Sequence, residues 1–97
     1  MPVDSWPFSE PRRTAAVTTA RVVDRRAPIR VVQHLAEGEG WTFLDGEAFD
    51  SALGRIITME HVYELDPSIG ELADMPQGWV AIRDQAGAPW RREPDDV

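Results

Sequence analysis

Two histidines and a large set of carboxylates are the groups in this chain that could do chemistry. His34 and His61 form neither an H-x-x-x-H nor an H-E-x-x-H motif, so a site of two histidines and one carboxylate has no sequence signature. No serine lies in a G-x-S-x-G nucleophile motif. Carboxylates between positions 37 and 47 could pair for acid–base catalysis, but acidic turns usually serve as solvated surface. We therefore expect no catalytic residue, no metal site and no cofactor.

Length and composition restrict the class of protein. A chain of 97 residues forms one small domain with a single core. The absence of cysteine excludes disulfides and thiolate metal sites. No apolar run approaches the roughly 20 residues needed to span a bilayer, and residues 1–11 lack the features of a secretory signal. We expect a cytoplasmic protein that does not insert into membranes.

Charge is distributed unevenly along the chain. The net charge is −7, and the segment 37–74 contains ten carboxylates and a single arginine, which gives that segment a charge of −9. The rest of the chain is slightly basic. Such a segment attracts basic partners and opposes nucleic-acid binding, which usually requires a basic face.

Segments rich in β-branched and aromatic residues predict short strands. The first two, Ala16–Asp24 and Ile29–Ala36, are expected to pair as a hairpin. In a third strand, Trp41–Asp45, the side chains of Trp41 and Phe43 share one face. Residues Arg55–Thr58 are expected to form a short strand or an extended lead-in. The last two predicted strands, Trp79–Arg83 and Ala88–Arg92, form a hairpin in which Trp79 and Trp90 could face each other.

Two helical turns are predicted between positions 58 and 76. Thr58 can cap the helix 59–65, and Asp66 followed by Pro67 is a typical start for a second helical element. In that element the apolar residues lie at helical spacing and face the core, whereas the polar residues point outward. The apolar stripe is Ile69, Leu72 and Ala73, and the outward residues are Ser68, Glu71 and Asp74.

These elements predict an α+β fold with about five short, mostly antiparallel strands and one or two short helices packed on one face. We expect an N-terminal arm over residues 1–14, a single domain over 15–93 and a frayed tail over 94–97. Trp6 and Phe8 could pin the arm onto the domain.

The assembled motifs resemble one small family of uncharacterised bacterial proteins built on a domain of unknown function. That domain is similar to one found among predicted immunity proteins of polymorphic toxin systems. The resemblance spans about residues 5–93, and the residues after Gly46 are fewer here than in the immunity-type domain. The motifs are W-P-F (6–8), V-T-T (17–19), P-I-x-V (28–31), G-W-x-F-L-x-G (40–46), L-D-P-S-I-x-E-L-A-D-x-P-x-G-W (65–79) and A-P-W-R-R-E (88–93).

Two functions from different classes are therefore expected. The first is a non-enzymatic interaction protein of the immunity type, which binds a basic protein partner through the acidic segment 37–74. The alternative is a small-ligand-binding or enzymatic domain with a pocket near His34, Trp41 and His61. A homodimer formed by edge pairing of the terminal hairpin is a further hypothesis. The predicted partner-binding residues are Glu60, Glu64, Glu71 and Asp74, with Trp79 as an anchor.

Overall fold

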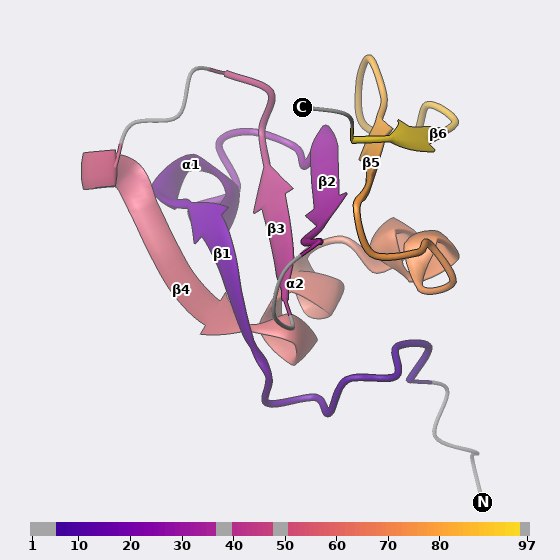
Figure 1. Ribbon diagram of the computed structural model, residues 1–97. Helices are drawn as coiled ribbons and strands as arrows, with labels where there is room; N and C mark the ends of the chain where they lie inside the picture. The colour runs from indigo at the N-terminus through magenta and orange to yellow at the C-terminus, as the bar shows by residue number, and fades with distance from the viewer. Residues whose placement is uncertain (1–5, 37–39, 48–50, 96–97) are drawn as a thin grey trace, which may run out of the picture.

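The computed structural model describes residues 6–36, 40–47 and 51–95. Within these residues, six strands form one mixed sheet in the order β4-β1-β3-β2-β5-β6, and short helices connect them (Figure 1). The fold is α+β, as predicted. The strands are β1 Ala15–Thr19, β2 Val31–His34, β3 Trp41–Leu44, β4 Gly54–Thr58, β5 Trp79–Ile82 and β6 Arg91–Pro94. The helices are α1 Ala20–Val23 and α2 Met59–Leu65, with 3-10 turns η1 Ser51–Leu53 and η2 Pro67–Leu72.

The predicted hairpin of the first two strands is wrong. β1 ends at Thr19, whose hydroxyl accepts a hydrogen bond from the N–H of Val22 at 3.3 Å and so caps α1. The β-branched residues after Thr19 therefore enter a helical turn instead of extending the strand. β1 pairs in parallel with β3 and antiparallel with β4, whereas β2 pairs with β3 and β5.

One face of the sheet carries the core. Phe43, Val32 and Ala81 lie in register across β3, β2 and β5, and all three are fully buried. Trp41 lies on the same face as Phe43, as the alternation predicted. The helical residues Met59, Val62, Ile69, Leu72 and Met75 complete this core.

The opposite face of the sheet is more open. Buried and half-buried residues alternate along β3, and the half-buried Val17 of β1 lies beside the half-buried Thr42, which places both on this second face. At its margin on β4, the Ile56 side chain is 74% exposed.

The helices α2 and η2 begin after the capping residues that the sequence predicts, Thr58 and Asp66. The Thr58 hydroxyl accepts from the N–H of His61 at 3.1 Å, and the Asp66 carboxylate accepts from the N–H of Ser68 at 3.0 Å. Ile69 and Leu72 are fully buried. Ser68 does not point outward as predicted, because its hydroxyl lies between Asp66 and Arg83.

The N-terminal arm contributes to the core. Phe8 is buried, and its ring packs edge-on against Trp41 with centroids 5.3 Å apart. Trp6 donates its indole N–H to the carbonyl of Glu10 at 2.7 Å and packs against Tyr63. The described part of the arm is thus fixed by aromatic contacts.

The final hairpin forms with a different register from the predicted one. Trp79 lies opposite Pro94, and β6 begins only at Arg91, so the expected pairing of Trp79 with Trp90 is wrong. The N–H of Asp95 donates to the carbonyl of Gly78 at 2.7 Å, while residues 96 and 97 lie outside the described residues. Among the described helices, none has the length and apolar character needed to cross a membrane.

Candidate functional site

Ion pairs in the folded protein neutralise part of the negative charge of the acidic segment 37–74. Four carboxylates of the acidic segment pair with arginines from outside it, so the segment presents a weaker field than its composition indicates. Glu37, Glu39 and Asp50 of this segment lie outside the described residues. The four pairs are Asp45–Arg21, Glu60–Arg12, Asp66–Arg83 and Asp74–Arg92.

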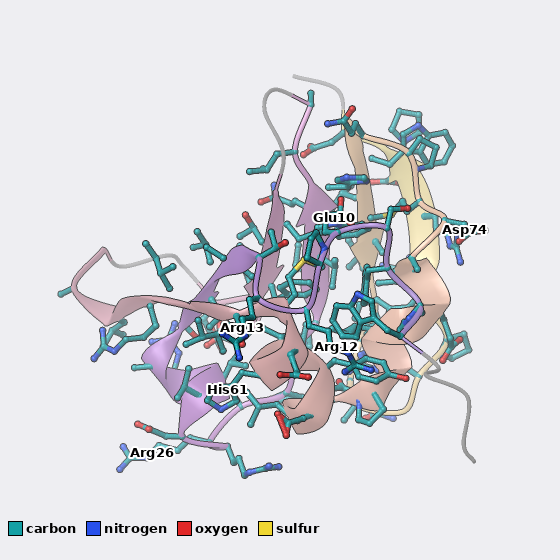
Figure 2. The ribbon with its side chains drawn as sticks, turned by 90° about the horizontal axis from the view of Figure 1, so that it is seen from below. Glu10, Arg12, Arg13, Arg26, His61 and Asp74 are labelled. Carbon is teal, nitrogen blue, oxygen red and sulfur yellow. The ribbon has the colours of Figure 1, made fainter. Side chains whose placement is uncertain are left out.

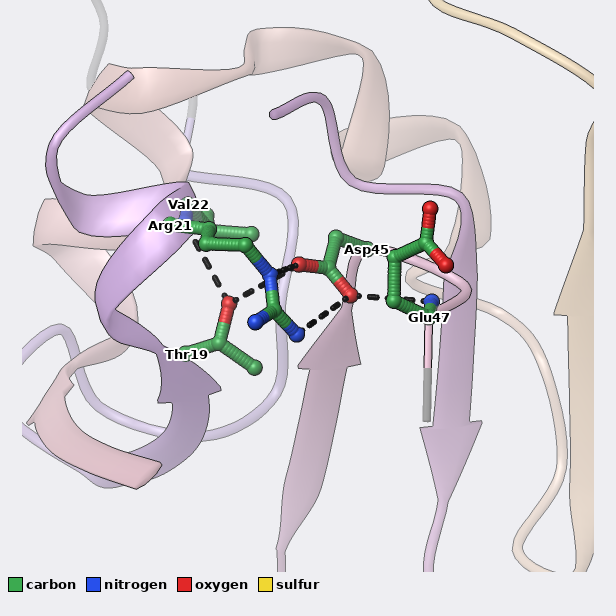
Figure 3. A network of polar contacts seen from close by, with 5 residues as sticks. All are labelled: Thr19, Arg21, Val22, Asp45 and Glu47. Carbon is green, nitrogen blue, oxygen red and sulfur yellow. Dashed lines mark hydrogen bonds and ion pairs between the residues drawn. The ribbon is translucent and has the colours of Figure 1, made fainter. Parts of the chain in front are cut away.

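The Asp45 pair is part of a buried network at the ends of the parallel strands β1 and β3 (Figure 3). Asp45 is 2% exposed and accepts from the guanidinium of Arg21, from the N–H of Glu47 at 3.0 Å and from the Thr19 hydroxyl at 3.5 Å. The Arg21 guanidinium holds the pKa of Asp45 below its usual range. Both oxygens of Asp45 accept hydrogen bonds from the protein itself, so this carboxylate helps to hold the ends of β1 and β3 together.

The Asp66 pair is centred on a buried arginine that sequence analysis missed. Arg83 is 2% exposed; its Nε donates to the carbonyl of Ile29 at 2.9 Å, and its terminal nitrogens donate to Asp66 at 2.5 Å and to the Ser68 hydroxyl at 3.0 Å. Its guanidinium also lies over the ring of Trp90. The alternation along β5 could have revealed it, because Arg83 follows two residues after the buried Ala81.

The predicted partner-binding carboxylates lie on α2, η2 and the turn that follows. We call these four the helical-layer carboxylates: Glu60, Glu64, Glu71 and Asp74.

Two of the helical-layer carboxylates form exposed ion pairs. Arg12 lies 2.9 Å from Glu60, with side chains 39% and 42% exposed, and Arg92 lies 2.7 Å from Asp74, whose side chain is 80% exposed. Arg92 also donates to the backbone carbonyl of Glu71 at 2.5 Å, and it holds the pKa of Asp74 below its usual range. Ion pairs this exposed add little to stability, so they exchange easily with other charges.

The other two members are open to solvent. Glu64 and Glu71 are exposed, and neither carboxylate has an ionic partner among the described residues. Trp79, the predicted anchor, is half-buried; it lies opposite His34 on β2 and packs against the core. The accessible part of the predicted site is therefore its set of carboxylates rather than its tryptophan.

The predicted pocket at His34, Trp41 and His61 is not assembled. His34 and Trp41 do meet, with rings stacked 3.9 Å apart, and His34 Nδ1 is hydrogen-bonded to the carbonyl of Met75 at 2.7 Å. A shallow groove of about 370 Å³ runs past His34 and Glu10, but Trp41 is buried beneath it. His61 is exposed on α2, well separated from Glu10 in Figure 2. No group of three candidate metal ligands occurs among the described residues.

The outer strand of the terminal hairpin carries features that oppose edge pairing. All four residues of β6 are exposed; two are arginines, one is a glutamate and the last is Pro94. Charged side chains and proline on an edge strand hinder the addition of another strand. These features count against the terminal hairpin as a dimer interface.

No protein-family model, curated protein or solved structure matches this chain significantly.

Proposed function

We propose that this chain is a non-enzymatic interaction protein of the immunity type, which binds a basic protein partner in the cytoplasm through the helical-layer carboxylates. The observation that carries the proposal is the exposure of Glu64 and Glu71 beside the two surface ion pairs of Glu60 and Asp74. Together they offer a partner four carboxylates on one connected helical segment.

The four helical-layer carboxylates can bind the cationic groups of a partner at a small cost in free energy. Glu64 and Glu71 need not break a described ion pair before binding a partner's cation. Glu60 and Asp74 can replace Arg12 and Arg92 at small cost, because exposed ion pairs are weak. The buried pairs of Asp45 and Asp66 stay in place, since breaking a buried pair is expensive.

The resemblance to immunity-type domains adds support. Its longest motif, residues 65–79, includes η2 together with Glu71 and Asp74. A partner recognised in this way would associate quickly at low ionic strength and more slowly as salt screens the charges.

Matched charge reversals test the proposal. Proteins from a lysate would be captured at low salt by the wild type, by E64K/E71K and by E47K/E93K, and identified by mass spectrometry. Glu47 and Glu93 are exposed carboxylates outside the helical layer, so both double variants change the net charge equally. We expect a basic protein that the wild type and E47K/E93K retain, that E64K/E71K loses, and that high salt releases. Equal retention by all three proteins, or equal loss from both variants, would contradict a site on the helical layer.

A further inference from the structure

A groove of about 470 Å³ has none of the four helical-layer carboxylates in its lining, although it borders their segment at Leu65, the neighbour of Glu64. Its walls come from separate parts of the chain: the turn after α1, the end of α2, the start of η2 and the turn between β5 and β6. In Figure 2, Arg26 on this groove and Asp74 on the helical layer lie at opposite sides of the molecule. The lining of the groove therefore shares no residue with the four helical-layer carboxylates.

The charge that the groove offers to a ligand comes from two arginines. Of its charged residues, Arg83 and Asp66 neutralise each other through their ion pair. Arg25 and Arg26 are exposed, and neither guanidinium has an acceptor among the described residues. The groove thus has a net positive charge in a chain whose overall charge is −7.

The backbone that carries these arginines is held in a fixed shape. Arg25 has a φ of 60°, a left-handed conformation that residues other than glycine adopt at an energetic cost. The N–H groups of Arg26 and Ala27 both donate to the carbonyl of Arg21, at 2.8 and 3.2 Å. The backbone of the turn that carries the two arginines is thereby ordered before a ligand binds, which lowers the backbone entropy lost on binding.

The groove also has apolar walls. Val22 and Ile29 belong to the core and lie at the base of the groove, where they are only 3% and 2% exposed. The apolar surface open to a ligand comes from the half-buried Leu65 and the exposed Pro28 and Ala86. Guanidinium groups bind carboxylates through paired hydrogen bonds, and the apolar walls favour a ligand with a hydrocarbon body. The negative charge of the whole chain repels polyanions more strongly than singly charged ligands.

From this geometry we propose that the groove binds a small apolar carboxylate, with the carboxylate held by Arg25 and Arg26 and the hydrocarbon placed against Pro28, Leu65 and Ala86. Two sources share this chemistry: a short-chain fatty acid and the C-terminal residue of a peptide.

Titration by ¹⁵N-HSQC NMR with hexanoate, hexanamide and acetate tests this assignment. We expect hexanoate to give saturable shifts at residues 22–29, 65–68 and 86–87. Hexanamide lacks the charge and acetate lacks the hydrocarbon body, so each should bind at least about tenfold more weakly. Equal binding of hexanamide, shifts confined to other regions, or no saturable shift with hexanoate would overturn the proposal.

Two pairs of substitutions locate the anion. R25Q/R26Q should weaken hexanoate binding about tenfold or more, whereas R13Q/R91Q removes the same charge from exposed arginines outside the groove and should leave binding unchanged. The single variant R26Q avoids any change at the left-handed Arg25 and should show a smaller loss. Equal weakening in R25Q/R26Q and R13Q/R91Q would show a general charge effect and overturn the site.

A further comparison separates the two sources. The acetylated peptide Ala-Ala-Leu would be titrated with a free and with an amidated C-terminus. Tighter binding of the free peptide than of hexanoate supports a peptide C-terminus as the ligand, and tighter binding of hexanoate supports a fatty acid. Equal affinity of the free and amidated peptides, together with no binding of hexanoate, would overturn the carboxylate site.

Discussion

The guanidinium carbon of Arg83 lies 4.1 Å from the centroid of the Trp90 ring, and the same guanidinium donates to Asp66. One buried side chain thus connects the end of β5, the residue before β6 and the cap of η2. A cation that lies over an indole ring and donates hydrogen bonds from all three of its nitrogens tolerates burial, because these contacts replace much of the hydration that it loses.

Replacing this arginine should destabilise the protein strongly. R83M removes the ionic partner of Asp66 and leaves the Ile29 carbonyl without its donor, so we expect a loss of about 2–4 kcal/mol in the free energy of unfolding. Urea unfolding measures it. The control R91M alters an arginine whose side chain is 64% exposed, and it should cost less than about 0.5 kcal/mol. Similar losses in both variants would contradict the role assigned to Arg83.

The Asp45 network should make stability depend on pH at the acidic end. Because the pKa of folded Asp45 lies below the ordinary value of 3.8, its stabilising effect is complete above that value and is lost as the pH falls through the folded-state pKa. D45N should lower the free energy of unfolding by about 1–3 kcal/mol at pH 7. Between pH 5 and pH 2 the wild type should lose more stability than D45N does. If urea unfolding showed that the free energies of unfolding of the wild type and D45N fall equally between pH 5 and pH 2, the assigned role of Asp45 would be disproved.

The arm should be required for full stability. F8A removes a buried ring that packs against Trp41, so we expect the free energy of unfolding to fall by about 3–5 kcal/mol. The adjacent change S9A, at an exposed position, should cost less than about 0.5 kcal/mol. Thermal unfolding followed by near-ultraviolet circular dichroism compares the two. A small effect of F8A would mean that the arm folds independently of the core.

Two consecutive isoleucines on β4 test the two faces of the sheet. Ile57 packs against the core and Ile56 is exposed, so I57A should cost about 1–3 kcal/mol and I56A less than about 0.5 kcal/mol. The two substitutions have identical chemistry and differ only in the face of the strand. Equal costs in chemical unfolding would contradict the assigned orientation of β4.

Local patterns predicted local features well. The alternation of Trp41 and Phe43 gave the buried face of β3, and Thr58 and Asp66 marked the starts of α2 and η2 because caps act over two or three residues. Strand pairing was harder to predict. The predicted hairpin of the first two strands does not form, because the Thr19 hydroxyl caps α1 and because β1 pairs with strands from later in the chain.

The candidate site shows the same limit. The sequence identified the helical-layer carboxylates, but two of them are neutralised by Arg12 and Arg92, which are 48 and 18 positions away from the carboxylates they bind. Such pairs follow from tertiary packing and leave no local pattern. The groove at Arg25 and Arg26 depends likewise on the approach of the turn between β5 and β6, which a linear pattern does not encode.

The order of strands in the sheet also constrains when the chain can fold during its synthesis. β1 has both of its partners later in the chain, and β2 is bordered on one side by β5, so the first half of the chain can form only an incomplete sheet. Trp6 of the arm gains its contact with Tyr63 only after α2 has left the ribosome. Cooperative folding of this domain therefore waits until β5 has emerged, and products truncated before β5 should remain unfolded and be degraded.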